Sequence, residues 1–234
     1  MSGRLDGSRV VVTGASRGLG RALAEAFAAE GARLVLTATT AGRLDATLAA
    51  VRDRGADAHP VALDLADRAS VASAAAEALA ALGRVDVLVA NASVLGTREP
   101  LETYPADTWD EVMAVNATGA LALIQGLLPG MADGGAIIAV TSGAAGRAGW
   151  GAYAVSKLAL EGITGMLREE LADRGIRCVA VNPGGLRTAM RAAAYPDEDP
   201  ATLPRPASVV EPFLAIAAGA DPGPRIDARD WRAA

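Results

Sequence analysis

Two side chains in the stretch GAYAVSK, Tyr153 and Lys157, have the types and the spacing needed for proton transfer. Residues four apart on a helix share one face, so the phenol and the ammonium would lie side by side. A fixed cation favours the phenolate and moves the tyrosine pKa down from its usual value of about 10. Lys157 is the single lysine among 22 Lys and Arg residues, which favours a specific role for an ammonium. The pair predicts a lysine-assisted tyrosine acid–base, against the alternative of two residues on a helix surface.

A glycine-rich stretch near the N-terminus, TGASRGLG, contains Gly14, Gly18 and Gly20. Glycine permits unusual φ values and lets a backbone approach a phosphate closely. The stretch follows an apolar run and precedes residues with the apolar period of a helix, whose N-terminal N–H groups and dipole favour a pyrophosphate. In this strand–turn–helix context the glycines predict dinucleotide binding, and a purely structural turn is the alternative.

The end of the second apolar run bears on the choice of dinucleotide. An NAD site requires an acid there to hold the ribose 2′-hydroxyl, but the sequence LVLTATTAGR has none before Asp45. Arg17, inside the glycine turn, could instead meet a 2′-phosphate. NADP(H) is therefore favoured over NAD(H). Asp64, after the third run, could accept a hydrogen bond from the adenine amine or cap a helix that begins near residue 66.

Alternation of apolar runs with helical stretches defines the fold class. Residues with helical period near 41–54, 67–83, 106–131, 152–174 and 207–218 lie between or after the runs. Such alternation predicts a Rossmann-type, doubly wound α/β fold: a mostly parallel sheet of six or seven strands with helices on both faces, in three αβα layers. The runs expected to be strands are 9–13, 32–37, 58–63, 85–90, 136–142 and 176–182.

No linker or repeat divides the chain, so we expect one domain over residues 1–234. Within it, the irregular segment 183–206 follows the sixth run and is expected to form a substrate loop, and residues 220–234 a short C-terminal tail. Loops at the carboxyl ends of parallel strands are where ligands bind in such sheets.

Composition excludes several classes of protein. The net charge of −5 argues against nucleic acid or an anionic membrane as the main partner. The single cysteine, Cys178, precludes an internal disulfide, fits a reducing cytoplasm and is expected in the core. We expect no signal peptide, no membrane span and no metal site, and we assign no role to the single histidine, His59.

Taken together, the motifs resemble those of the short-chain dehydrogenase/reductase family, from about residue 8 to residue 190. The resemblance implies that Tyr153 is the general acid–base and that Lys157 lowers its pKa while binding the nicotinamide ribose. It also implies that Ser142 binds the substrate oxygen, that Asn116 supports a proton-relay water and that Thr188 binds the carboxamide. The stretches that carry it are TGASRGLG (13–20), ANAS (90–93), AVNATG around Asn116, VTSGAAG around Ser142, YAVSK (153–157) and NPGGLRT (182–188).

The resemblance also implies a set of cofactor-binding residues and a small-molecule carbonyl or alcohol substrate. Members of the family commonly assemble as homodimers or homotetramers through helices that correspond to 106–131 and 152–174. The residues expected to bind NADP(H) are Gly14, Ser16, Arg17, Gly18, Leu19, Gly20, Asp64, Leu65, Asn91, Ala92, Tyr153, Lys157, Pro183, Gly184, Leu186 and Thr188.

Three features depart from the usual family pattern. The chain has ANAS where NNAG is frequent, so Ala90 and Ser93 replace an asparagine and a glycine. Ser142 precedes Tyr153 by eleven residues where thirteen is common, which leaves either Ser142 or Thr141 to face the substrate. The C-terminal sequence GPRIDARDWRAA predicts a seventh strand that is short or absent.

These inferences favour an NADPH-dependent reductase of ketones or aldehydes, or the reverse alcohol oxidation. Trp150, three residues before Tyr153, is a candidate wall of the substrate pocket. A non-catalytic dinucleotide sensor or scaffold with the same fold is one alternative, and it would tolerate loss of the Ser, Tyr or Lys. An epimerase or dehydratase with the same Tyr–Lys pair is another, although such chains usually carry a separate substrate domain.

Overall fold

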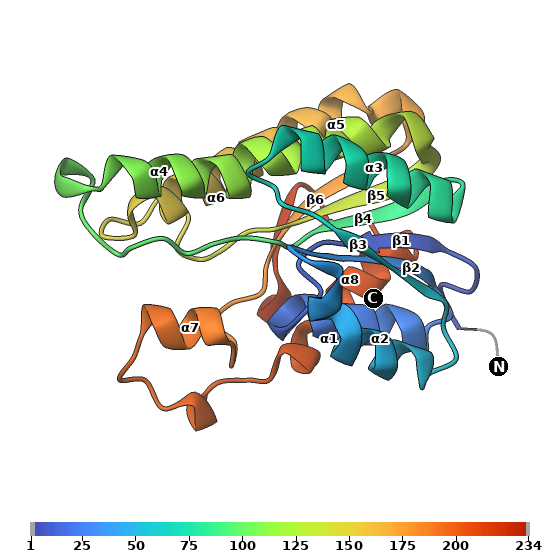
Figure 1. Ribbon diagram of the computed structural model, residues 1–234, viewed down its shortest axis with the longest axis horizontal. Helices are drawn as coiled ribbons and strands as arrows, with labels where there is room; N and C mark the ends of the chain where they lie inside the picture. The colour runs from blue at the N-terminus through green and yellow to red at the C-terminus, as the bar shows by residue number, and fades with distance from the viewer. Residues whose placement is uncertain (1–2, 233–234) are drawn as a thin grey trace.

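A sheet of seven parallel strands runs through the centre of the protein (Figure 1). The structure, a computed structural model, describes residues 3–232. The strand order is β3-β2-β1-β4-β5-β6-β7, so the winding reverses between β1 and β4. The predicted doubly wound parallel sheet is therefore confirmed. The strands are β1 (Arg9–Val12), β2 (Arg33–Ala38), β3 (Ala58–Ala62), β4 (Val85–Ala90), β5 (Met131–Val140), β6 (Arg177–Asn182) and β7 (Arg225–Asp227).

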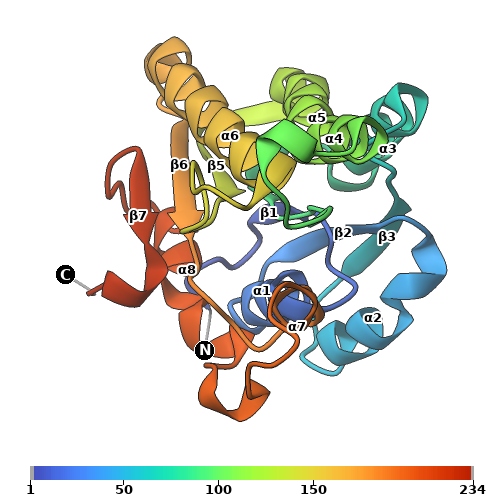
Figure 2. The same ribbon diagram turned by 90° about the vertical axis from the view of Figure 1, so that its left-hand side faces the viewer.

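Helices cover both faces of the sheet, and Figure 2 shows the three layers from the side. One face carries α1 (Gly18–Ala29), α2 (Asp45–Arg52) and α8 (Glu211–Ala217). The other carries α3 (Arg68–Leu82), α4 (Ala106–Met113), α5 (Ala120–Leu127) and α6 (Gly151–Glu170).

Two buried apolar cores follow from the alternation of side chains along the strands. Val10 and Val12 of β1 point into the core beneath α1, while Val11 points into the core beneath α3 and α5. Because both faces of the sheet are covered, its inner strands are apolar at nearly every position, which explains why they are recognisable in the sequence.

The helix expected over 106–131 is a composite of several turns. A π-helical turn, Ala114–Gly119, joins α4 to α5, and a 3₁₀ turn ends the helix at Gly130. Among the described residues, the stretch Ala106–Gly130 is the one helix long and apolar enough to cross a membrane by length and composition. It packs against α3 and α6, and its inner residues Leu123, Ile124 and Leu127 are buried, which accounts for its apolar composition.

Two other elements differ from expectation. β5 begins at Met131 rather than near 136. The sequence pattern does not reveal its first residues, because Asp133, Gly134 and Gly135 interrupt the apolar run where the register with β4 shifts. Segment 183–206 is not wholly irregular, since it contains α7 (Ala189–Ala194).

The seventh strand is present but only three residues long, and it pairs in parallel with β6. The expected tail and domain limits at residues 1–2 and 233–234 lie outside the described residues.

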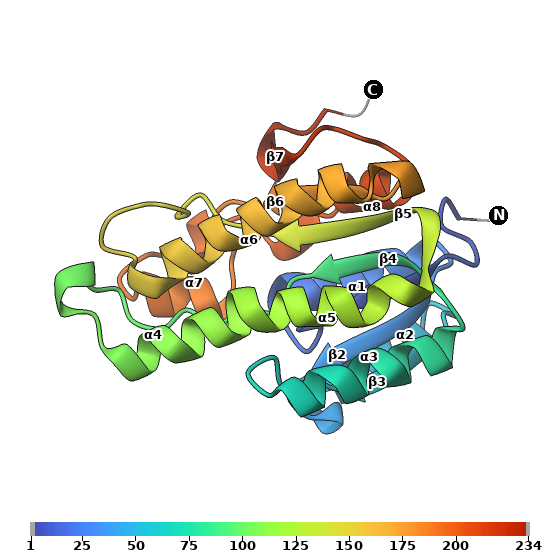
Figure 3. The same cartoon turned by 90° about the horizontal axis from the view of Figure 1, so that it is seen from above.

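The carboxyl ends of the strands point toward the edge where the functional loops lie. In Figure 3 the arrowheads of β4 and β5 point to the side on which α4, α7 and the start of α6 extend beyond the sheet. Residues that follow β1, β4, β5 and β6 therefore meet at this edge, next to the reversal of the winding between β1 and β4.

Candidate active site

A cleft of about 710 Å³ opens at the carboxyl edge of the sheet. All the sequence-predicted site residues line it except Asn116. The cleft extends from the second strand and the glycine turn, past the ends of β4 and β5, to α7. The geometry thus brings the glycine turn and the Tyr153–Lys157 pair into one site.

The glycine turn is shaped by close packing. Gly14 and Gly18 have φ values of 65° and 59°, in the left-handed region that favours glycine. A Cβ atom on Gly20 would contact the Gly14 carbonyl and lie 2.6 Å from Asn91 Nδ2, so this position excludes a side chain. The turn leads into α1, whose N-cap Arg17 provides no side-chain cap. This helix end and the exposed turn backbone fit a pyrophosphate, which would be held by backbone N–H groups.

Asn91, directly after β4, stabilises the glycine turn through hydrogen bonds. Its Nδ2 donates to the carbonyl oxygens of Thr13 (2.8 Å) and Gly14 (3.3 Å). Thr13 Oγ1 in turn accepts from the backbone N–H groups of Asn91 and Ala92, each at 2.9 Å. The hydrogen bonds of the Asn91 side chain therefore stabilise the glycine turn.

At the far end of the cleft, β2 ends in Ala38 and carries no acid. Thr39 and Arg43 line this end together with Arg17, and Arg43 donates to Thr39 Oγ1 at 3.0 Å. Sequence reasoning missed Thr39 and Arg43, although a basic residue shortly after the second strand was a usable signal. The pair of guanidiniums fits a phosphate on the adenine ribose.

Asp64 lines the cleft after β3, and its carboxylate accepts from Ala66 N at 2.9 Å. The alternative that Asp64 caps the next helix is wrong. The N-cap of α3 is Asp67, whose carboxylate accepts from Ala69 N and Ser70 N. Two acids lie close together before this helix, and only the later one has the spacing of a cap.

Tyr153 is almost fully buried, with 7% of its surface exposed. Burial raises the pKa of its phenol, and a hydrogen bond from Ser142 lowers that pKa in part. The sequence argument expects a lowered pKa, so the direction in this structure is the opposite. The reason is desolvation, which penalises the phenolate and outweighs the hydrogen bond from Ser142.

Lys157 lies beneath the tyrosine and is only 2% exposed. Its Nζ is 5.6 Å from the centroid of the Tyr153 ring and donates to the carbonyl oxygen of Val140 at 2.8 Å. Burial lowers the pKa of Lys157 to about 8. The amine is thus held at one point by β5, stays mostly protonated at pH 7 and loses its proton near pH 8.

Ser142 and Thr141, which follow β5, point to different partners. Thr141 Oγ1 donates to Glu161 Oε1 of α6 at 2.6 Å and is buried there. Ser142 Oγ accepts from Ala144 N at 3.1 Å and hydrogen-bonds Tyr153. Of the two hydroxyls left open by the shortened loop, that of Ser142 lies beside the tyrosine.

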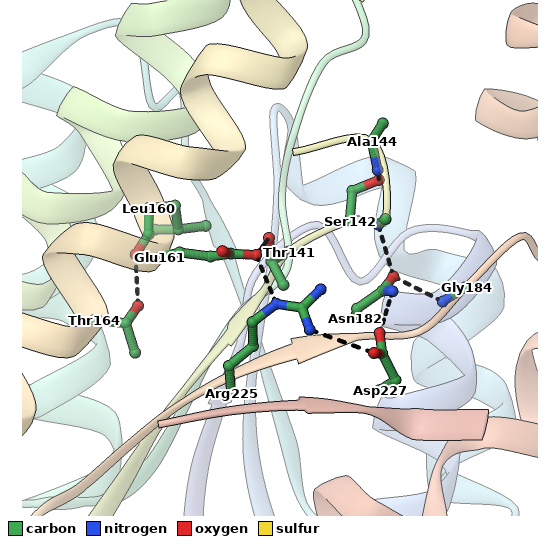
Figure 4. A network of polar contacts seen from close by, with 11 residues as sticks. Thr141, Ser142, Ala144, Leu160, Glu161, Thr164, Asn182, Gly184, Arg225 and Asp227 are labelled. Carbon is green, nitrogen blue, oxygen red and sulfur yellow. Dashed lines mark hydrogen bonds and ion pairs between the residues drawn. The ribbon is translucent and has the colours of Figure 1, made fainter. Parts of the chain in front are cut away.

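A polar network fixes the backbone around Ser142 (Figure 4). Asn182, at the end of β6, accepts with one oxygen from both Gly143 N and Gly184 N, each at 3.0 Å. Asn182 Nδ2 donates to Asp227 of β7. A single amide therefore holds the serine loop and the loop after β6 in one arrangement.

The network continues through the C-terminal strand. Arg225 donates to Asp227 Oδ2 (3.3 Å) and to Glu161 Oε1 (3.1 Å), which also accepts from Thr141. Four elements, β5, β6, β7 and α6, are linked by these contacts (Figure 4). The sequence analysis assigns no role to Glu161, Arg225 or Asp227, because nothing in their spacing along the chain brings them together.

Asn116 does not reach the cleft with its side chain. It lies in the π-helical turn, is 1% exposed, and donates to Val94 O (2.9 Å) and Ser156 Oγ (3.0 Å) while accepting from Val94 N (2.8 Å). Val94 lines the cleft. The amide therefore acts on the wall of the site through Val94.

Thr188 is similarly engaged by the protein. Its hydroxyl oxygen accepts from Arg191 N at 3.2 Å as the N-cap of α7. A Cβ atom on Gly18 would lie 3.4 Å from Thr188 Cγ2, so the glycine turn and the loop after β6 approach each other across the cleft.

Cys178, in contrast, is fully buried in β6, and burial raises the pKa of its thiol to about 11. This agrees with the expected core position and leaves the thiol unreactive. Within residues 3–232, no cluster of three or more His, Cys, Asp or Glu side chains is arranged to hold a metal ion.

Known proteins share both the sequence pattern and this geometry. The family model for short chain dehydrogenases matches residues 8–199. The uncharacterized oxidoreductase YciK of Escherichia coli K12 is 37% identical over 212 residues, which cover 88% of this chain and 84% of the relative. A 2-dehydro-3-deoxy-L-rhamnonate dehydrogenase (NAD(+)) of Sphingomonas sp. SKA58 is 35% identical, over 78% of this chain and 73% of the relative.

A solved structure extends the likeness to three dimensions. The short chain dehydrogenase from Shigella flexneri 2a, crystallised in complex with NADP, has a TM-score of 0.90 at 33% identity, and the match covers 98% of this chain and 100% of that one. The chain belongs to the short chain dehydrogenase family. It is an oxidoreductase of a family that binds nicotinamide dinucleotides.

Proposed function

We propose that the protein transfers hydride between NADP(H) and a ketone or aldehyde, with alcohol oxidation as the reverse reaction. The observation that carries the proposal is the meeting of Ser142, Tyr153 and Lys157 in the cleft that begins at the glycine turn. The nicotinamide supplies the hydride when it is bound. The protein's task is to bind the carbonyl, stabilise its oxygen and deliver a proton.

Ser142 and Tyr153 are the groups that act on the substrate oxygen. Both hydroxyls lie together, so both can donate to a carbonyl oxygen that gains negative charge. Tyr153 then transfers its proton to that oxygen. The raised pKa of Tyr153 keeps the phenol protonated at neutral pH, as the reductive direction requires.

Lys157 and Asn116 support this chemistry from buried positions. The buried Lys157 ammonium offers positive charge to the tyrosine and further donors to ribose hydroxyls, beyond the one used on Val140. Asn116 is assigned as a positioning residue, because its amide holds Val94 and Ser156 rather than facing the cleft.

The choice of NADP(H) rests on the adenosine end of the cleft. Arg17 and Arg43 line it, and β2 ends without the acid that would hold a free 2′-hydroxyl. The solved relative that binds NADP supports this assignment, whereas the Sphingomonas relative is named for NAD(+). The residues of this chain favour the phosphorylated cofactor.

Titration with NADPH and NADH tests the cofactor assignment. In Arg17→Ser and Arg43→Ser variants, the Kd for NADPH should rise at least about tenfold, as expected for loss of a charge-assisted phosphate contact. The Kd for NADH should stay within about twofold. Arg33→Ser is the matched control, because Arg33 begins β2 at the opposite end of the strand. Tighter binding of NADH than of NADPH by the wild type would overturn the assignment.

We propose one folding unit over residues 1–234, since the described strands form one sheet and helices cover both of its faces. A cytoplasmic location is favoured by the single unpaired cysteine. A homodimer or homotetramer is favoured by Leu158 and Met166, which are 47% and 65% exposed on α6 and eight residues apart, hence on one helix face.

A further inference from the structure

The substrate end of the cleft is bounded by an apolar cluster from three separate segments. Its buried members include Ala144, Trp150 and Ala194, and it packs around Tyr153. Partly buried members are Leu95, Met190 and Tyr195. All of these residues line the cleft. We refer to Trp150 and Tyr195, the two large rings besides the catalytic tyrosine, as the aromatic wall.

The aromatic wall stands directly beside the reacting group. The Trp150 ring centroid is 5.9 Å from that of Tyr153, and the Tyr195 centroid is 5.8 Å from that of Trp150. Both distances are typical of aromatic pairs that attract each other. A group attached to a carbonyl held by Tyr153 therefore has these rings as its neighbours.

Arg98 packs against both rings of the aromatic wall, Trp150 and Tyr195. Its guanidinium carbon is 4.5 Å from the ring centroids of both Trp150 and Tyr195. Its Nη1 donates to Ala194 O at 2.5 Å. Trp150 precedes α6 and Tyr195 follows α7, so Arg98, from the loop after β4, joins segments that are far apart in the sequence.

A second guanidinium holds Tyr195. Arg191 lies 3.9 Å from the Tyr195 centroid and forms two hydrogen bonds of 2.6 Å with Glu198. The charges of Arg98 and Arg191 are thus engaged by the Ala194 carbonyl, by Glu198 and by ring faces. What the wall offers a substrate is mainly carbon surface.

We propose that the aromatic wall selects carbonyl compounds that carry an apolar, preferably aromatic, group next to the reacting carbon, with Arg98 as its positioning residue. The inference rests on the proposed carbonyl reduction. A sugar or polyol chain in the same place would lose its hydrogen bonds to water against carbon surface, whereas a phenyl group would gain by leaving water.

Two diketones that differ in one substituent test the wall: 1-phenyl-1,2-propanedione and 2,3-butanedione, each reduced with NADPH. L-erythrulose represents the polyol class. For the wild type, kcat/KM should be at least about tenfold higher for the phenyl compound than for butanedione, and lowest for erythrulose. In Trp150→Leu the phenyl-to-methyl ratio should fall at least about fivefold. Comparing this ratio in the variant with that in the wild type cancels the difference in intrinsic reactivity between the two diketones.

The matched control is Trp109→Leu, since Trp109 lies on α4 outside the cleft lining and should leave the ratio unchanged. For Arg98→Met, KM for the phenyl compound should rise about tenfold while kcat changes less than threefold. Arg98→Lys should recover little, because an ammonium lacks the planar face that rests on rings. A loss of kcat with unchanged KM would contradict the positioning role.

A binding measurement separates this inference from the proposed function. Calorimetry with the Tyr153→Phe protein loaded with NADPH reports binding of each carbonyl without turnover. Preferential binding of the phenyl compound supports the wall, even if the wild type reduces no carbonyl and the proposed function fails. Reduction by the wild type with equal kcat/KM for phenyl and methyl compounds, or with erythrulose preferred, overturns the wall and leaves the reductase standing.

Discussion

Lys157 occupies a position where an ammonium is unfavourable, since 2% of its surface is exposed and its Nζ donates a hydrogen bond to Val140 O. Burial of a cation opposes folding, so the residue is retained at a cost in stability. Such a cost is common for groups kept for chemistry rather than for the fold.

The pH dependence of stability should reveal this cost. The pKa of Lys157 is lowered to about 8 in the folded protein, from about 10.5 when unfolded. Between these values the unfolded state binds more protons, so stability rises with pH. From pH 7 to pH 9.5 the wild type should gain about 2 kcal/mol of unfolding free energy relative to Lys157→Met. Urea unfolding at each pH measures the difference, and parallel curves for the two proteins would contradict it.

The sequence predicts the Tyr153–Lys157 pair but not the environment of the two side chains. The i, i+4 spacing of Tyr153 and Lys157 is local, so it can be read from the chain alone. The direction of the Tyr153 pKa shift depends on how completely the surrounding loops exclude water, and that is a property of tertiary packing. Asn116 was likewise recognised by its motif, although its hydrogen bonds to Val94 and Ser156 depend on the folded structure.

Among the elements, the short strand β7 is linked through hydrogen bonds to the backbone next to Ser142. Its residues Arg225 and Asp227 connect Glu161 of α6 with Asn182 of β6. Through Asn182 Oδ1 they reach the backbone of Gly143, directly after Ser142 (Figure 4). The orientation of the Ser142 hydroxyl is therefore linked to the C-terminal strand.

An exchange of the two partners tests this link. Asn182→Asp faces Asp227 with a second carboxylate, so kcat/KM should fall about tenfold through repulsion and loss of a donor. Adding Asp227→Asn restores a donor–acceptor pair with the roles exchanged, and the double variant should recover most of the activity. Steady-state kinetics of both single variants and the double variant measure the coupling. Asp57→Asn, at an ion pair outside the network, is the control.

Additive losses in the double variant would show that the two residues act independently. The network could not be found from the sequence, since its members are spread from residue 141 to residue 227. The strands themselves were predictable where both faces are covered and the pattern is apolar throughout. β7 has exposed and half-buried residues at the sheet edge and gives no such pattern.

For the whole molecule, helices α4 to α6 form a layer whose outer side carries apolar residues. Leu158 and Met166 are exposed on α6, and about half of the most apolar part of the stretch Ala106–Gly130 is unburied. Exposed apolar surface of this kind favours association of two copies. The order of the layers followed from the alternation of strands and helices, whereas the association of copies depends on surface geometry that the sequence pattern does not specify.

A single charge on this surface should weaken assembly. We expect Met166→Glu to shift the protein toward the monomer, with a dissociation constant at least about tenfold higher than that of the wild type. Light scattering across a concentration series measures the shift. Leu101→Glu is the control, since Leu101 is exposed but lies outside these helices. A wild type that is monomeric at all concentrations would contradict the proposed assembly.

The proposed carbonyl reduction depends on Tyr153 as the proton donor in the cleft. The most direct measurement is NADPH binding together with carbonyl turnover in Tyr153→Phe, a change that removes one hydroxyl from a buried ring. We expect NADPH affinity within about threefold of the wild type and a kcat lower by at least about a hundredfold, the range expected for loss of a general acid. Turnover equal to that of the wild type, with NADPH still bound, would contradict it.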